Sequence, residues 1–419
     1  MISVETALKK VLSTVSQLEA ERKPILDCLE QVLAEGIRAP FPVPPLDNAA
    51  MDGFAVAAAD IRDANPQHPA VLKVIGEAAA GSLFNGKVRR GTAIRIMTGA
   101  PVPSGANAVV PFEETDEEIR RQRAIALKEI GIHRAFEPGA NIRRAGEDIR
   151  SGSIVFEKGH ALRPADIGVI ASLGQVEALV IRRPVVAVLA TGNEVIEVGR
   201  VLPPGGIYNS NSFSLAAQIT KAGGIPKILG IARDSVKSLV TAIRRGLDCD
   251  LLLTTGGVSL GDYDLVKDVL ANEGEISFWT VRMKPGKPLA FGTFKNASGR
   301  RIPHLGFPGN PVSAMTSFEL FGRPAIRKML GLKTLTRPTV KAVLESTINN
   351  RDRRRVFARV IVSGHNDKYY ATLTGDQGSG ILTSMSRANG LAVVPEDIPI
   401  ARPGQEVDVI MLNWEEAQR

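Results

Sequence analysis

The chain has 419 residues, with 52 basic and 44 acidic side chains and a formal net charge of +8. Apolar residues make up 44% and charged residues 23% of it, a usage typical of globular proteins that excludes a disordered chain. No apolar run approaches the roughly 18 residues that a membrane-spanning helix needs. The first ten residues carry an acid and two lysines and no apolar signal segment, and only Cys28 and Cys249 are available for disulfides. We therefore expect a cytoplasmic protein with no membrane contact.

The positive net charge leaves two classes of partner open, nucleic acids and small anions. The densest basic cluster is Arg351, Arg353, Arg354 and Arg355, interrupted by Asp352. Aromatic residues, which stack on bases in nucleic-acid grooves, are only 5% of the chain, and no aromatic-rich stripe accompanies the cluster. We interpret the cluster as a solvated face and expect no nucleic-acid partner, with a nucleic-acid binder as an alternative to be tested.

The N-terminal part of the chain predicts a helix, two connectors and a small β domain. Residues 4–19 have apolar side chains at helical spacing, and a Pro-rich run that ends at Leu46 follows. From about Asn48 to Ala140, short apolar segments alternate with Gly, Pro and charged turns, which is typical of a β domain. Its expected strands are 71–75, 93–97, 108–111 and 124–127, and the second connector after it contains an expected strand at 154–156 and a helix at 164–172.

The rest of the chain predicts an α/β domain and then a second β domain. From about Arg182 to Gly331, strand and helix patterns alternate, which favours a mostly parallel sheet with helices on both faces. Beyond Arg337 only strand patterns follow. The expected strands are 185–189, 227–231, 251–254, 277–281, 289–291 and 304–307 in the α/β segment and 340–344, 356–362, 369–373, 391–394 and 407–411 after it; the expected helices are 212–222, 235–245, 265–272 and 312–329.

Polar or charged residues, in four of five cases together with glycine, follow five strands of the predicted α/β sheet. These strand-end loops are 191–194, 233–234, 255–264, 283–288 and 308–311. Open α/β sheets bind ligands outside the carboxyl ends of their strands. One such loop alone is most simply a turn, but five on the same edge favour a shared ligand site.

The residues of these loops predict a site for a phosphate group and a magnesium ion. Glycines in the loop 255–259 leave backbone N–H groups free to bind an anion, and Lys284 and Lys287 add positive charge from a loop restricted by prolines. The alternative is that the glycines form a tight turn, the lysines are solvated and the acids cap helices. No P-loop or dinucleotide-binding motif is present. The carboxylates suited to Mg²⁺ are those of Glu194, Asp234, Asp262 and Asp264.

At these loops the sequence resembles the molybdopterin molybdenumtransferase family, which includes MoeA of bacteria and the gephyrin E domain of animals. Matching blocks follow the family's order over most of the chain, and they are specific together although each is weak alone. Ala49, Phe54, Asn193 and Thr255 stand where the family more often has Ser, Tyr, Asp and Ser. The blocks are NAAMDGFA at 48–55, RIMTGAP at 95–101, NIRRAGED at 141–148, ATGNE at 190–194, YNSN at 208–211, the loops 255–264 and 283–288, and PGNPVS at 308–313.

The resemblance implies both a fold and an activity. The fold combines a molybdopterin-binding-type α/β domain with an elongated connector domain, a β-rich insertion and a C-terminal β-barrel. The activity is the last step of molybdenum cofactor biosynthesis, in which molybdenum from molybdate is inserted into adenylylated molybdopterin and AMP is released. We place the parts at 1–20 (a helix packing with the α/β domain), 21–46 and 141–178 (connector), 47–140 (insertion), 179–331 (α/β) and 332–419 (barrel).

The resemblance also implies partners and site residues. It implies a homodimer with active sites shared between subunits, and it makes molybdopterin adenylyltransferase and molybdoenzyme maturation proteins candidate partners. Cations must lie between molybdate and a pyrophosphate for both anions to bind. The candidate catalytic residues are Lys284, Lys287, Glu194, Asp234 and Asp264, faced by Asp52, Thr98, Arg143 and Asp148. The candidate substrate-binding residues are Thr191, Gly192, Asn209, Ser210, Asn211, Thr255, Gly256, Gly257, Val258, Ser259, Pro308, Gly309, Asn310 and Ser313.

Two rival functions fit parts of the sequence. The molybdopterin adenylyltransferases share the α/β domain, but they are single-domain proteins, so the insertion and the C-terminal segment argue against them. A non-enzymatic scaffold, as in animal gephyrin, would need a fused partner domain or a receptor groove, and the sequence shows neither. The sequence does not distinguish molybdate from tungstate as the preferred substrate.

Overall fold

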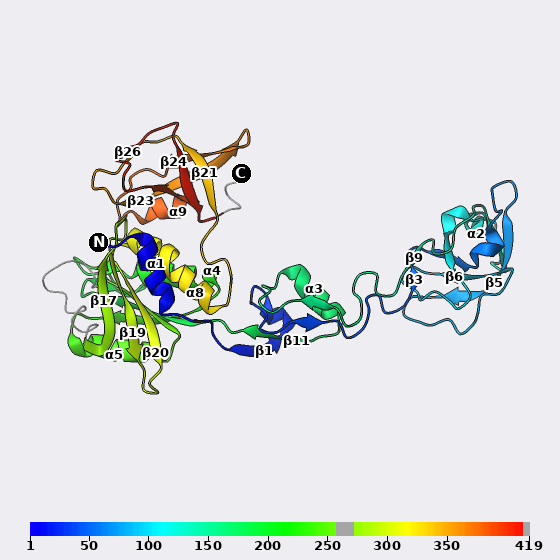
Figure 1. Ribbon diagram of the computed structural model, residues 1–419, viewed down its shortest axis with the longest axis horizontal. Coiled ribbons are helices and arrows are strands. Elements are labelled where there is room, and N and C mark those ends of the chain that lie inside the picture. The colour runs from blue at the N-terminus through cyan, green and yellow to red at the C-terminus, as the bar shows by residue number, and fades with distance from the viewer. Residues whose placement is uncertain (257–271, 414–419) are drawn as a thin grey trace. The chain divides into compact units, whose positions relative to one another are not determined.

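The computed structural model describes residues 1–256 and 272–413, and Figure 1 shows the chain coloured along its sequence. The chain forms two compact units. The first unit contains residues 1–23, 28–34 and 179–419, and the second contains residues 24–27 and 35–178. This division is coarser than the five segments expected from the sequence, whose boundaries stay a prediction.

The first unit is built around a six-stranded sheet with the order β15-β12-β16-β20-β19-β17. The first four strands are parallel, and β19 and β17 continue the sheet as antiparallel neighbours. The mostly parallel sheet is therefore confirmed, with an antiparallel hairpin at one edge. The strands are β12 (Val185–Thr191), β15 (Ile225–Ala232), β16 (Leu251–Thr255), β17 (Gly274–Thr280), β19 (Pro288–Lys295) and β20 (Arg301–Phe307).

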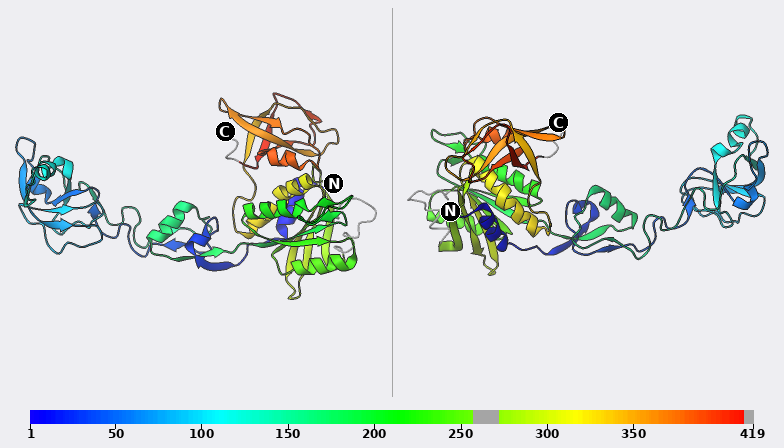
Figure 2. Two further views of the ribbon diagram at one scale, coloured as in Figure 1. Left: turned by 180° about the vertical axis from the view of Figure 1, so that it is seen from behind. Right: turned by 45° about the horizontal axis from the view of Figure 1, so that its top comes forward.

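Helices cover both faces of this sheet because alternate side chains of its central strands are apolar on each face. Val186 and Val188 of β12 belong to the core beneath α1, α4, α7 and α8, whereas Ala187 and Leu189 belong to the core beneath α5. Figures 1 and 2 show α1, α4 and α8 together on one side of the sheet and α5 on the other. The helices are α1 (Val4–Ser13), α4 (Ser210–Ala222), α5 (Val236–Gly246), α7 (Pro311–Ser317) and α8 (Arg323–Met329).

The single helix expected at 312–329 is interrupted. A π-helical segment, Phe318–Gly322, separates α7 from α8, and Pro324 stands at the start of α8. Proline has no N–H to donate and clashes with the preceding turn, so an α-helical hydrogen-bond ladder is broken at this point.

The C-terminal part of the first unit is a closed five-stranded β-barrel, as expected. The strand order β23-β24-β21-β27-β25 closes through the pairing of β23 with β25. A short strand of the α/β part, β18 (Met283–Lys284), pairs in parallel with β23. Phe357, Met385 and Leu391 of the barrel belong to the same apolar core as the α/β domain. The barrel strands are β21 (Thr339–Leu344), β23 (Arg355–His365), β24 (Lys368–Leu373), β25 (Gly390–Val394) and β27 (Glu406–Met411).

The second unit contains a five-stranded sheet with the order β7-β4-β6-β5-β8. The strand expected at 124–127 is wrong. A short helix, α2 (Glu117–Gln122), precedes a turn in which Ala124 has a φ of 53°, and the strand begins only at Glu129. The short apolar run at 124–127 was misleading because the chain turns there. The strands are β4 (Gly53–Val56), β5 (Ala70–Ala78), β6 (Thr92–Ile96), β7 (Ala108–Pro111) and β8 (Glu129–Ile132).

The connector elements expected at 154–156 and 164–172 are confirmed as β10 (Ile154–Phe156) and α3 (Pro164–Ser172). In the part of the chain that the structure describes, no helix is long and apolar enough to cross a membrane. The shorter elements are β1 (Ala20–Pro24), β2 (Ile37–Arg38), β3 (Asn48–Ala49), β9 (Ile142–Arg143), β11 (Glu177–Ile181), β13 (Val195–Ile196), β14 (Ile207–Tyr208), β22 (Ile348–Asn349), β26 (Ile400–Ala401) and α9 (Leu382–Arg387).

Candidate functional site

The five strand ends that precede the strand-end loops lie along one edge of the six-stranded sheet. Strands β15, β12, β16 and β20 are parallel, so their carboxyl ends share an edge. Strand β17 runs in the same direction, because both β17 and β20 are antiparallel to β19. The loop 281–287 between β17 and β19 is therefore at this edge as well, which agrees with the expectation from the sequence.

Asn211, in the first turn of α4, joins two of these loops. Its Nδ2 donates to Thr255 Oγ1 at 2.7 Å and to the Gly309 carbonyl at 2.7 Å. Thr255 Oγ1 donates in turn to the Pro308 carbonyl at 3.2 Å. The Asn211 Oδ1 atom is buried and has no hydrogen-bond partner within residues 1–256 and 272–413. The amide thus holds the loops after β16 and β20 together through its two N–H donors.

Gly256 allows the backbones of two strand ends to approach closely. Its φ is 95°, and a Cβ at this position would lie 2.7 Å from both the carbonyl oxygen and Oγ1 of Thr191. Thr191 Oγ1 also donates to the Thr255 carbonyl, at 3.4 Å. Only glycine combines this left-handed conformation with such a short approach. The backbone geometry therefore requires glycine at position 256, whether or not a ligand binds to this loop.

Two carboxylates stand on the neighbouring loops that follow β12 and β15. Glu194 is exposed, and a Cβ on Gly192 would lie 2.7 Å from both of its carboxylate oxygens, so that carboxylate folds back over Gly192. Asp234 Oδ2 accepts from the Asn193 backbone N–H at 3.2 Å, and Asn193 Oδ1 accepts from the Asp234 backbone N–H at 3.2 Å. Arg233 donates to the carbonyl of Asn193 at 2.8 Å. Sequence reasoning did not predict that Asn193 and Arg233 would connect these two loops by hydrogen bonds.

The two acids suit magnesium better than a metal enclosed by protein ligands. Mg²⁺ usually takes one or two carboxylates and completes its shell with water and phosphate oxygens. Within residues 1–256 and 272–413, no three His, Cys, Asp or Glu side chains come together as a metal site. Glu194 and Asp234 thus fit a magnesium ion shared with a phosphate ligand.

The two lysines lie on a loop that is fixed from both sides. A Cβ on Gly286, whose φ is 96°, would lie 2.7 Å from Ser317 Oγ, so the loop packs closely on α7. The Lys284 Nζ is 3.9 Å from Asp352 Oδ2, and the Lys284 side chain is 49% exposed. Lys287 is half-buried and forms no ion pair with any residue that the structure describes. Both ammonium groups therefore have free hydrogen-bond donors toward the described surroundings.

The remaining predicted binding residues lie at the starts of α4 and α7. Asn209 is buried, and its Oδ1 caps α4 by accepting from the Ser212 N–H at 3.2 Å, whereas its Nδ2 has no partner among the described residues. Ser210 begins α4 and Ser313 is buried within α7. Asn310 stands at the N-cap position of α7 without a side-chain capping bond, and its Nδ2 donates instead to Ser379 Oγ of the C-terminal part at 3.1 Å.

Five predicted site residues lie outside the described residues. They are Gly257, Val258, Ser259, Asp262 and Asp264.

In the second unit, Asp52 is held by Thr98. Asp52 Oδ1 accepts from the backbone N–H of Thr98 at 2.7 Å and from its hydroxyl at 2.8 Å. These hydrogen bonds lower the pKa of Asp52 below its ordinary value. Arg143 is exposed on β9, opposite Asn48 of β3, and Asp148 is exposed beyond the following turn. The structure thus brings Asp52 and Thr98 into contact, and it places Arg143 and Asp148 on the surface of the same unit.

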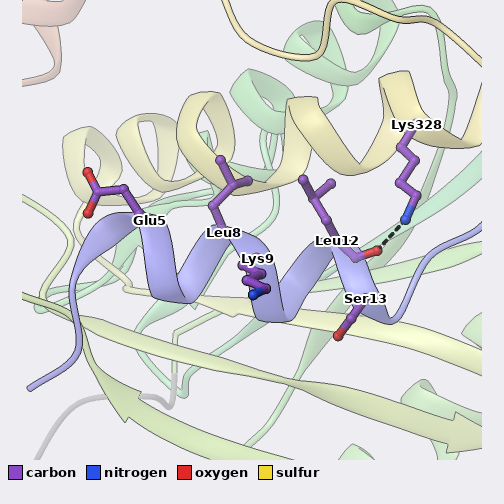
Figure 3. A pocket seen from close by; sticks show the side chains of 6 residues that line it. All are labelled: Glu5, Leu8, Lys9, Leu12, Ser13 and Lys328. Carbon is purple, nitrogen blue, oxygen red and sulfur yellow. Dashed lines mark hydrogen bonds between the residues drawn. The ribbon is translucent and has the colours of Figure 1, made fainter.

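A separate hollow of about 440 Å³ lies on α1 and α8, lined by Glu5, Leu8, Lys9, Leu12, Ser13 and Lys328. Figure 3 shows its side chains, with Lys328 Nζ donating to the Leu12 carbonyl at 2.7 Å. None of its lining residues belongs to the strand-end loops, so this hollow is not the predicted site.

Comparison with known proteins assigns the whole chain to one family. Three family models match, described as MoeA N-terminal region (domain I and II) at residues 2–174, probable molybdopterin binding domain at 187–328, and MoeA C-terminal region (domain IV) at 341–412. Molybdopterin molybdenumtransferase 2 of Mycobacterium tuberculosis is 37% identical over 92% of this chain and 93% of its own length. Molybdopterin molybdenumtransferase of Bacillus subtilis is 33% identical over 99% of this chain and 95% of its own length.

A solved structure agrees with this assignment. The molybdopterin biosynthesis MoeA protein of Pyrococcus horikosii superposes with a TM-score of 0.81 at 33% identity, and the match covers 99% of each chain. Identity above 30% over nearly the full length goes beyond a shared fold and indicates common descent. The chain belongs to the molybdopterin molybdenumtransferase family.

Proposed function

We propose that this chain inserts molybdenum from molybdate into adenylylated molybdopterin and releases AMP, in the last step of molybdenum cofactor biosynthesis. Family membership supports its assignment as a transferase of this pathway. In the reaction, the two dithiolene sulfurs of the pterin bind molybdenum in place of molybdate oxygens, which leave as water. A water molecule cleaves the pyrophosphate bond, so that AMP leaves and the pterin keeps its phosphate. The chain's task is to bind two anions side by side and to hold the groups that react.

The convergence of strand-end loops on Asn211 is the observation that carries this proposal. Asn211 fixes Thr255 and Gly309, and the close approach at Gly256 adds Thr191. The site built on these loops binds the phosphate end of the pterin, with Asn209, Ser210, Asn310 and Ser313 of the helix starts beside it. The loop residues Gly257, Val258 and Ser259 contribute backbone N–H groups to the same phosphate.

Magnesium supplies positive charge to the phosphate oxygens when it is bound. Glu194 and Asp234 would hold the ion, together with Asp262 and Asp264. The exposed carboxylates of Glu194 and Asp234 support this assignment, since they leave room for water and phosphate ligands.

Lys284 and Lys287 bind the pyrophosphate and molybdate. Two anions repel each other in one site unless cations lie between them. The loop that carries these lysines packs closely against α7 at Gly286, so its ammonium groups are offered from a fixed backbone. Preorganised charge of this kind stabilises an anionic transition state without reorganisation during the reaction.

Asp52, Thr98, Arg143 and Asp148 form the opposite wall of the site, contributed by the second subunit of a homodimer. The hydrogen bonds from Thr98 keep Asp52 ionised and oriented. A cytoplasmic location and docking with molybdopterin adenylyltransferase and molybdoenzyme maturation proteins complete the proposal.

AMP release tests this function. The full chain is incubated with adenylylated molybdopterin, Mg²⁺ and molybdate, and AMP is followed with each component omitted in turn. We expect AMP only when all are present. Absence of AMP from the complete mixture would refute the transferase assignment.

A further inference from the structure

The basic cluster at 351–355 is brought beside the lysine loop of the candidate site. Strand β18 pairs in parallel with β23, which places Met283 opposite Arg355 and Lys284 opposite Val356. The Arg355 backbone N–H donates to the Arg282 carbonyl at 3.0 Å, and Arg354 Nη1 donates to the Met283 carbonyl at 3.4 Å. The turn 350–355, which leads into β23 at Arg355, is therefore fixed against the loop that carries Lys284.

Some charged side chains of this turn form ion pairs, whereas others form none with the described residues. Asp352 accepts from Arg354 Nε at 3.0 Å and also pairs with Arg354 Nη2, while its Oδ2 is 3.9 Å from Lys284 Nζ. Burial raises the pKa of Asp352, but the hydrogen bond from Arg354 and the nearby Lys284 outweigh it and lower that pKa. Arg351 and Arg353 are exposed, and their side chains form no ion pair with any described residue.

We propose that the turn 350–355 is a wall of the oxyanion site, in which Asp352 is the counter-charge that restrains Lys284 and Arg351 and Arg353 attract the anion. This inference rests on the proposed role of Lys284 in binding the substrate's oxyanions. Asp352 is a positioning residue, because it acts on the anion through Lys284. The ligand class is a multiply charged oxyanion, either molybdate or the pyrophosphate of the nucleotide.

The proposal predicts opposite signs for two kinds of substitution. Loss of the Asp352 charge leaves Lys284 and Arg354 without their shared counter-ion, so the local potential becomes more positive and an anion binds more tightly. Loss of the Arg351 and Arg353 charges makes the potential less positive and weakens binding. If the turn had only a structural role, both kinds of substitution would lower the anion affinity, because any disturbance of the turn would weaken binding.

The test is equilibrium dialysis of the full chain against molybdate and, in a separate arm, against inorganic pyrophosphate. We compare Asp352→Asn, the double variant Arg351→Gln/Arg353→Gln, and Lys284→Gln. Asp408→Asn is the matched control, because it removes one exposed acid that pairs with Lys341 at 3.0 Å on the barrel strands β21 and β27. Asp352→Glu, which keeps the charge, controls for the shape of the side chain.

We expect Asp352→Asn to bind about two- to fivefold more tightly and the double arginine variant about two- to fivefold more weakly, as for exposed charges screened by water. Asp408→Asn and Asp352→Glu should bind as the unchanged protein does. When Lys284 is already replaced by Gln, the increase in anion affinity caused by Asp352→Asn should be less than half of the increase seen with Lys284 present, since the two residues act together. The arm that shows the larger change identifies the anion.

The results distinguish a failure of the proposed function from a failure of the inference about the turn 350–355. If Lys284→Gln binds both anions normally, the proposed role of Lys284 is wrong, and the inference that depends on this role is wrong as well. If Lys284→Gln weakens binding but Asp352→Asn matches Asp408→Asn, the transferase site stands and the turn is not part of it. Weaker binding by Asp352→Asn, or an unchanged gain in the Lys284→Gln background, also overturns the inference.

Discussion

The side-chain amide of Asn211 donates a hydrogen bond to the hydroxyl of Thr255 at 2.7 Å. The same nitrogen also donates to the Gly309 carbonyl at 2.7 Å, so a residue of α4 holds the ends of β16 and β20 together. The amide is the one group in this contact that offers two N–H donors, and a carboxylate of the same shape offers none. The arrangement of the phosphate loops therefore depends on the identity of this side chain.

Asn211→Asp should decrease activity sharply while the fold persists. The new carboxylate would face the Gly309 carbonyl and leave it without a donor, which costs about 1–3 kcal/mol in the free energy of unfolding. We expect AMP release to fall at least about tenfold, because the loops would move apart by more than the reaction tolerates. The measurements are AMP release and urea unfolding of both proteins.

Asn296→Asp is the matched control for this variant. Asn296 Oδ1 accepts from the backbone N–H of Ser298 and Arg300 in the turn between β19 and β20, and a carboxylate oxygen preserves these bonds. Normal activity of Asn211→Asp would show that the loop contact does not matter for the reaction.

Lys284→Gln and Lys287→Gln should each lower apparent affinity for molybdate or nucleotide roughly ten- to a hundredfold, since a charge-assisted contact to an oxyanion is worth about 1.5–3 kcal/mol. Stability should barely change, because partly exposed charges contribute little to folding. Substrate titrations with thermal melts separate these effects. Lower melting temperatures with unchanged half-saturation for both ligands would remove the lysines from the site.

Glu194→Ala and Asp264→Ala should abolish AMP release with little loss of stability. Glu194 is exposed and contributes no apolar surface to the core. Removal of a magnesium ligand should also shift the magnesium requirement of any residual activity to higher concentrations. Glu197→Gln, an exposed acid three residues beyond Glu194, is the control. Turnover with an unchanged magnesium requirement in either alanine variant would contradict the assignment.

Mixing two inactive variants tests whether the site is shared between subunits. Asp52→Ala and Asp264→Ala each damage one of the two proposed walls, so a heterodimer would contain one site with both walls intact. We expect partial recovery of AMP release after subunit exchange, up to about a quarter of the normal activity for random pairing. No recovery, despite exchange demonstrated with differently tagged chains, would indicate that each site is built within one chain.

The folding of the second unit should depend on pH through Asp166. Burial raises the pKa of Asp166, but hydrogen bonds from Arg163 and His160 outweigh it and lower that pKa to about 2. A carboxyl whose pKa is lower in the folded state stabilises the fold above its unfolded pKa, near 4, and loses this contribution as the pH falls toward 2.

Asp166→Asn should therefore reduce the free energy of unfolding by about 1–2 kcal/mol at pH 7. The difference from the unchanged protein should remain constant down to about pH 5 and shrink between pH 4 and pH 2. Chemical denaturation at several pH values measures it. A difference that grows as the pH falls would have the wrong sign for this mechanism.

The sequence predicted the α/β sheet, the helices at 212–222 and 235–245 and the common edge of the strand ends, because alternating patterns and parallel strands determine that edge. The helix expected at 312–329 is interrupted, and the one expected at 265–272 lies outside the described residues apart from its last position. It did not predict that β17 and β19 form a hairpin, since a strand pattern carries no direction. It missed the contacts that fix the loops, such as Arg233 with Asn193 and Ser379 with Asn310. These contacts join residues that are 40 and 69 positions apart in the chain, so local patterns do not reveal them.

The basic cluster at 351–355 shows a different limit of the sequence. Its composition favoured a solvated face, and Arg351 and Arg353 are indeed exposed. The pairing of β18 with β23 nevertheless places this cluster beside Lys284. A pairing between a two-residue strand and a barrel strand about 70 residues later has no signature in the sequence, because it depends on how the domain core and the barrel pack.

The most direct test of the transferase account is the stoichiometry of metal uptake and AMP release in one sample. The full chain is incubated with adenylylated molybdopterin, Mg²⁺ and molybdate, the pterin is isolated, and its bound molybdenum is compared with the AMP released. The account predicts equal amounts of both at every time point, and neither when molybdate is omitted. AMP released without matching molybdenum on the pterin, or at the same rate without molybdate, would contradict it and indicate simple hydrolysis.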